Sequence, residues 1–154
     1  MPATKLENHS TSLILKAIEE IVSKQGFKFN EDLSDTQSGK ASKKEFKLFL
    51  SEAERHDSSS RQNFRISGTF ELELMHNGQG GTNKTLLAAS DDVENIIFDI
   101  ERFAPDKFIA AKSLIHSTQI ERWSTQPYKS GSDAKLKTTL IFTIIYRIRN
   151  PNAT

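Results

Sequence analysis

Residues 135–149 alternate between apolar and polar side chains with the period of a β-strand. Successive strand residues point to opposite faces, so one face here is apolar and the other carries lysine, arginine and threonine. The apolar face consists of Leu136, Leu140, Phe142, Ile144, Tyr146 and Ile148. Ile141 and Ile145 interrupt the polar face, which predicts that it is also covered in part, either by a helix of the same chain or by another subunit.

The composition is typical of soluble globular proteins, and 154 residues suit one domain with its own core. We expect a single domain over residues 1–154, ordered over residues 10–149 between short flexible termini. Cysteine is absent, which excludes disulfides, thiol catalysis and cysteine-ligated metals. The net charge of +1 excludes a strong overall attraction to nucleic acid or acidic partners. No apolar run reaches the length of a bilayer, and residues 1–10 lack a signal-peptide core, so we expect a cytoplasmic chain without membrane contact.

The helical pattern occurs twice. Residues 12–25 form one amphipathic helix, which Gly26 ends. A second helix ends near Phe103, because Pro105 cannot continue it. Its apolar stripe consists of Val93, Ile96, Ile97, Ile100 and Phe103. Ser90 followed by Asp91, Asp92 and Glu94 is typical of a helix N-terminus, where a capping side chain and negative charge are favourable. Residues 86–89 are an alternative first turn of this helix.

Four further strands follow from alternation and turn signals, at residues 27–33, 44–52, 63–74 and 108–122. Polar connections are expected at residues 34–42, 55–62, 77–83 and 123–133. The predicted fold is therefore α+β, with the order α-β-β-β-α-β-β and a mainly antiparallel sheet of about five strands packed by two helices.

Catalytic and cofactor patterns are weak throughout the chain. Residues 78–85 approach a phosphate-binding loop, but Asn83 stands where that loop needs a glycine before the lysine. The four histidines lack metal-ligand spacing, and the serines lack the nucleophile-elbow pattern. We therefore predict a protein that is not an enzyme and that takes no cofactor, metal or small-molecule substrate.

The candidate residues are instead those of an interaction surface. Basic residues cluster at Lys43, Lys44, Lys47, Arg55, Arg61 and Arg65, with phenylalanines between them. This pattern is typical of single-strand nucleic-acid binders, in which aromatic rings stack on bases. An alternative interpretation is a basic face that meets the acidic second helix of a neighbouring copy, at Asp91, Asp92 and Glu94. Trp123 is either an interface anchor or packed against its own hairpin.

The element order and the final pattern of residues 143–148 resemble the tail terminator (tail completion) proteins of long-tailed bacteriophages, over residues 10–148. The resemblance implies a virion subunit, made in the host cytoplasm, that forms a homo-hexameric ring on the tail tube. Such a ring ends tube growth at the head-proximal end of the tail and offers a surface to head-completion proteins. Its partners are other copies of itself, the tail tube protein and the neck protein. Another neck or tube component of the same fold is the nearest alternative.

Overall fold

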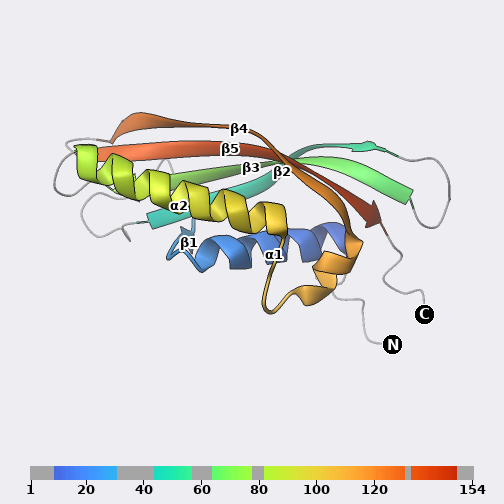
Figure 1. Cartoon of the computed structure of the whole chain (residues 1–154). Helices are drawn as coiled ribbons and strands as arrows, with labels where there is room; N and C mark the ends of the chain where they lie inside the picture. Colours follow the sequence, from blue (N-terminus) through green and yellow to red (C-terminus); the bar gives the residue numbers. More distant parts are fainter. Residues whose placement is uncertain (1–8, 31–43, 57–63, 78–81, 131–132, 149–154) are drawn as a thin grey trace.

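The computed structural model describes residues 9–30, 44–56, 64–77, 82–130 and 133–148 (Figure 1). The elements along the chain are α1 (Ser10–Ser23), β1 (Lys28–Phe29), β2 (Lys44–Arg55), β3 (Phe64–Asn77), α2 (Thr82–Arg102), the 3-10 helix η3 (Ile109–Leu114), β4 (Ile115–Ser130) and β5 (Asp133–Ile148). The predicted order α-β-β-β-α-β-β is confirmed, with η3 added between α2 and β4.

The strands form one five-stranded sheet in the order β1-β2-β3-β5-β4. All neighbouring pairs are antiparallel except β1 with β2, which is parallel. Both helices lie on one face of the sheet, where α1 contacts β1, β2 and β5 and α2 contacts β3, β5 and β4 (Figure 1). The molecule thus has two layers, and the second face of the sheet is not covered by any described helix.

The core lies between these layers, as the alternation predicts. The apolar face of β5 is buried from Leu140 to Tyr146, beside Phe70, Leu72 and Leu74 of β3. Strand β2 adds Phe46 and Leu48. The helices contribute many of the other buried apolar residues, chiefly Ile14, Ala17, Ile18, Ile21 and Val22 of α1 and Ala89, Val93, Ile96 and Ile100 of α2. One polar position interrupts the buried face of β5: the hydroxyl of Thr138 lies 2.8 Å from that of Thr125 in β4, which satisfies both groups.

The second helix begins at Thr82 rather than at Ser90, so the predicted N-terminus is wrong. Residues 82–89 contain no glycine or proline, and Leu86, Leu87 and the two following alanines are strong helix formers. The helix therefore continues upstream and buries Ala89 against the sheet. Asn83 and the lysine after it lie within this helix, and residues 78–81 lie outside the described residues.

The strand predicted at residues 108–122 is wrong in its first half and too short at its end. Residues Ile109–Leu114 form η3, which turns Ala111 and Leu114 into the core. The strand β4 then runs on to Ser130, through most of the connection expected at residues 123–133. Backbone hydrogen bonds to β5 stabilise this polar segment, although its composition favours a loop.

The other connections are described only at their ends. The strand β2 extends to Arg55, beyond its expected end at residue 52, and residues 57–63 of the predicted hairpin tip lie outside the described residues. The strand predicted at residues 27–33 is described only as β1, Lys28–Phe29, and the connection at residues 34–42 also lies outside the described residues.

Candidate interaction surface

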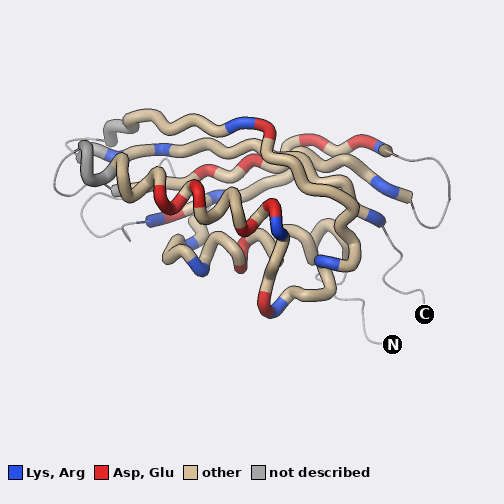
Figure 2. Tube along the Cα trace, in the orientation of Figure 1, with Lys and Arg blue, Asp and Glu red and all other residues tan. Residues whose placement is uncertain are grey.

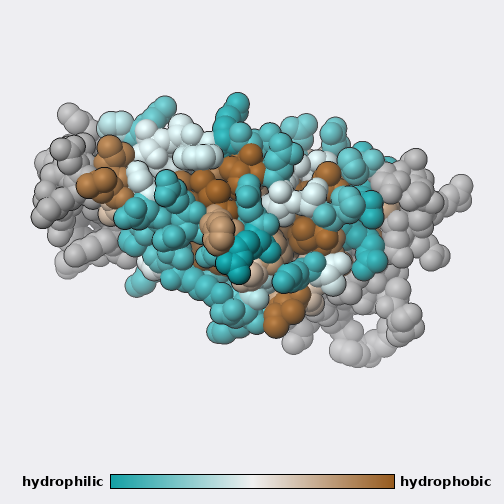
Figure 3. Space-filling view, viewed as in Figure 1, coloured by the Kyte–Doolittle hydropathy of each residue, from teal (hydrophilic) through white to brown (hydrophobic). Residues whose placement is uncertain are grey.

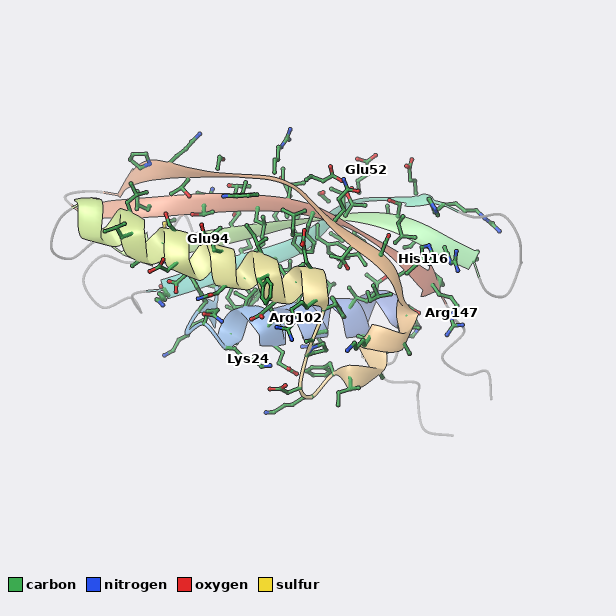
Figure 4. All side chains as sticks on the ribbon, in the orientation of Figure 1. Lys24, Glu52, Glu94, Arg102, His116 and Arg147 are labelled. Atoms are coloured by element: carbon green, nitrogen blue, oxygen red, sulfur yellow. The ribbon has the colours of Figure 1, made fainter. Side chains whose placement is uncertain are left out.

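The face of the sheet opposite the helices, here called the open face, is the first candidate surface. It includes Lys47, Phe49 and Glu52 of β2, Arg65, Glu71 and Glu73 of β3, Arg122, Ser124 and Gln126 of β4, and Lys137, Ile141 and Ile145 of β5. Glu52 points away from both helices in Figure 4. Ile141 and Ile145 are half-buried here, so the prediction that a helix of this chain covers them is wrong for the described residues.

Apolar side chains on the open face are separated by charges. Phe49, Glu71, Ile141 and Arg122 lie opposite one another across the four neighbouring strands. A shallow depression of about 320 Å³ lies between β4 and β5. It is lined by Arg122, Ser124, Gln126, Pro127, Lys137, Thr139 and Ile141. This polar, open surface suits a broad protein contact better than an enclosed small molecule.

The predicted basic cluster is not one surface. Lys47 and Arg65 lie on the open face, whereas the Arg55 guanidinium lies 4.5 Å from the centre of the Phe64 ring on the helix side. Lys47 stands opposite Glu73, which pairs with Lys137 at 3.2 Å. Figure 2 shows basic and acidic residues interspersed over the strands rather than gathered by sign on one of them. Lys43 and Arg61 lie outside the described residues.

Lys44 belongs to a partly buried polar cluster that no spacing in the sequence predicts. Its Nζ lies 3.0 Å from Oδ2 of Asp92, and Nε2 of His76 lies 2.8 Å from the same oxygen. Lys44 also donates to the carbonyl of Gln25 at 3.1 Å, and the Phe27 ring meets the His76 ring edge-on. These contacts join α2 to β2, β3 and the end of α1. Burial lowers the pKa of His76, although Asp92 acts in the opposite direction.

The acidic residues of α2 therefore divide between two roles. Asp92 faces the sheet, whereas Asp91 and Glu94 are exposed, as Figure 4 shows for Glu94 on α2. All three lie in the middle of the helix, so they do not mark its N-terminus. The Arg102 guanidinium covers the exposed Phe98 ring at 5.1 Å from its centre.

Large apolar side chains are exposed on the helix side of the molecule. They are Phe29, Leu86, Leu87, Phe98, Ile109 and Trp123. Figure 3 shows hydrophobic areas along α2 and β4, separated by hydrophilic side chains. Trp123 lies within β4, opposite the buried Leu140, and is 52% exposed. Packing against its own hairpin therefore covers only about half of the Trp123 side chain. The exposed half is available for contact with a partner.

The described residues contain no group of three histidine, aspartate or glutamate side chains that could hold a metal ion. Within the same ranges, no helix has the length and apolar character needed to cross a membrane. A comparison of the sequence with protein-family models finds no match, and neither does a comparison with curated proteins.

Proposed function

We propose that this chain is a structural subunit that assembles head to tail into a ring, and that the ring is a tail terminator of a long-tailed bacteriophage. The observation that carries the proposal is that both edges of the sheet are largely unpaired among the described residues, and that the two edge strands β2 and β4 run in opposite directions. At one edge, β2 pairs with β1 only at Glu45 and Phe46 among the described residues. At the other edge, no described strand pairs with the free side of β4.

The strand directions fit a head-to-tail contact. Each step from β2 to β3, to β5 and to β4 reverses direction, so β4 runs opposite to β2. Copies in a cyclic ring share one orientation along the ring axis, so β4 of one copy meets β2 of the next in the antiparallel sense. Antiparallel pairing is the more stable kind, and long unpaired edges invite it.

The remaining parts of the function follow from the resemblance. The resemblance to tail terminators is based on the element order, and it implies a ring of six copies. The open face, with its mixed charges and half-buried Ile141 and Ile145, is the surface proposed to meet the tube protein or the head-completion protein. Docking on the last tube ring would stop tube growth by shape, with no bond made or broken. The protein would therefore act in the virion, at the head-proximal end of the tail.

The test combines light scattering across protein concentration, negative-stain imaging and growth of tail tubes from purified tube protein. Rings of six that bind tube ends and limit tube length would support the proposal. Rings that leave tube length unchanged would indicate another neck or tube component. A monomer that binds no tube end would overturn it, and salt-sensitive binding of oligonucleotides would then favour the nucleic-acid interpretation.

A further inference from the structure

Two exposed aromatic side chains lie at opposite edges of the sheet and on the same face. Trp123 in β4 is 52% exposed and lies opposite Leu140, whose side chain faces the helices. Phe29 in β1 is 47% exposed and lies opposite Phe46, which also faces the helices. Each ring is therefore at a lateral end of the helix layer, Trp123 on the side of α2 and Phe29 in the short strand β1 on the side of α1.

The register of the sheet places these two rings in neighbouring rows. Trp123, Leu140, Leu72 and Leu48 form one row across the strands from β4 to β2. The next row on the same face runs from β4 to β1 and consists of Thr125, Thr138, Leu74, Phe46 and Phe29. Rows on one face are two residues apart, about 7 Å along the strand. A stagger of that size between adjacent copies would bring the two rings into line.

We propose that Trp123 of one copy packs against Phe29 of the next copy, and this inference rests on the ring proposed above. The contact is heterologous, because the two rings belong to different surfaces of the same chain. Aromatic side chains bury large areas and are frequent at the centres of protein interfaces. The partner is therefore a second copy of this chain. In each copy, an edge-on contact with Phe46 holds the Phe29 side chain in place.

Apolar residues of α2 extend the same contact surface. Leu86 and Ile97 are eleven residues apart, which is about three helical turns, so they share one flank of α2. Asp92 occupies the other flank and contacts β2 and β3 through Lys44 and His76. The flank with Leu86 and Ile97 therefore faces β4. Leu86 is 44% exposed and Ile97 is partly buried against the core. Contact with the next copy would cover Leu86 together with Trp123.

The absence of cysteine allows a direct test by crosslinking. The double variant Trp123→Cys with Phe29→Cys is treated with a short bismaleimide and separated on a denaturing gel. We expect a ladder of covalent multimers that ends at the closed ring, and at most trace dimer from either single variant. The matched control joins Phe29→Cys with Lys112→Cys, since Lys112 is exposed on η3 and is not part of either edge. This pair should give no ladder.

The outcomes separate the inference from the proposed function. Efficient dimers from Trp123→Cys alone would replace the heterologous contact by a two-fold one and overturn the inference. Rings in images without a ladder would also overturn it, while the ring function would stand. A wild-type chain that forms no ring, alone or on tubes, would overturn both. As a second readout, Trp123 is the only tryptophan, so its fluorescence emission should shift to shorter wavelength on assembly.

Discussion

At the scale of single residues, Gly68 allows the aromatic core to close. A Cβ atom at this position would lie 3.1 Å from both the Phe70 and Tyr146 rings and 3.2 Å from Leu50. The Phe70 ring stacks on Phe142, and the Tyr146 hydroxyl lies 2.9 Å from that of Thr11, so both rings have further contacts that hold them. The close approach of these rings to the backbone therefore favours glycine, because a Cβ atom would force them to shift.

Substitution of Gly68 by valine should destabilise the fold by overpacking. We expect the free energy of unfolding to fall by about 1–3 kcal/mol, and Gly68→Ala to have a smaller effect because alanine adds one carbon and is better suited to a strand. Urea unfolding of both variants measures this difference. Equal stability of wild type and Gly68→Val would show that the rings adjust freely.

His76 makes stability depend on pH. Its Nε2 faces the carboxylate of Asp92, whose other partner is Lys44, and its buried Nδ1 has no hydrogen-bond partner among the described residues. Protonation would place an N–H group at Nδ1 without an acceptor. Because the pKa of the folded histidine lies below the ordinary value of 6.5, the unfolded chain takes up the proton first. The contribution of His76 is therefore complete above pH 6.5 and decreases as the pH falls below it.

We expect the melting temperature to fall between pH 7 and pH 5.5, and the fall to be smaller in His76→Leu. His116→Gln is the matched control, since His116 is exposed on β4. Thermal unfolding at several pH values measures the effect. An unchanged pH dependence in His76→Leu would contradict the assignment.

At the scale of elements, α1 fixes the segment that follows α2. The Glu20 carboxylate accepts hydrogen bonds from the backbone N–H groups of Asp106, Lys107 and Phe108, the last two at 2.7 and 3.2 Å. Lys24 adds an ion pair with Asp106 at 2.7 Å, and points toward that segment in Figure 4. Burial raises the pKa of Glu20, but the three N–H groups together hold it below its usual value. This contribution is present above pH 4.5 and is lost as the pH falls further.

Removal of the Glu20 charge should loosen this connection. We expect Glu20→Gln to lower the free energy of unfolding by about 1–3 kcal/mol, because three backbone donors lose a charged acceptor. Amide hydrogen exchange should also become faster at residues 106–108. In the control variant, Glu19→Gln, an exposed contact with Lys16 at 3.7 Å is lost, which should cost less than about 0.5 kcal/mol. Unchanged exchange in Glu20→Gln would contradict the role of this carboxylate.

The early start of α2 gives a second prediction at this scale. Leu87 is 68% exposed in the second turn of the helix, so its side chain adds little to the core. Leu87→Pro should still cost about 3 kcal/mol, since proline removes a helical hydrogen bond and clashes with the preceding turn. Leu87→Ala is the control and should be nearly neutral. If urea unfolding gave equal stability for both variants, the helix would begin after Leu87, as the pattern at Ser90 suggests.

At the scale of the whole molecule, the proposed ring would couple stability to protein concentration. Subunits that bind one another in the folded state shift the unfolding equilibrium toward the ring by mass action. We expect the melting temperature to rise over a concentration range of about a hundredfold, and to rise less in Trp123→Ala. Differential scanning calorimetry measures both. A melting temperature independent of concentration would exclude a ring of the free protein over that range.

Local patterns in the sequence determined the order of the elements and the buried faces of β2, β3 and β5. The alternation in β3 and β5 has a period of two, and this period assigns Leu72, Leu140 and their neighbours to one face without knowledge of any partner. The spacing in α1 and the proline after α2 likewise depend on neighbouring residues in the chain. These features gave the α+β class and the order of elements correctly.

Contacts between distant segments decided the rest. The polar half of β4 is a strand because β5 supplies its hydrogen bonds. Ser90 is internal to α2 because the helix continues upstream and buries Ala89. Lys44, His76 and Asp92 come from three elements, so no spacing in the sequence predicts their contact. The proposed contact between Trp123 and Phe29 depends on the neighbouring rows of these residues, and the rows exist only once five strands are in register. Sequence periodicity acts within one element, whereas burial of charge and the position of an edge depend on which elements become neighbours.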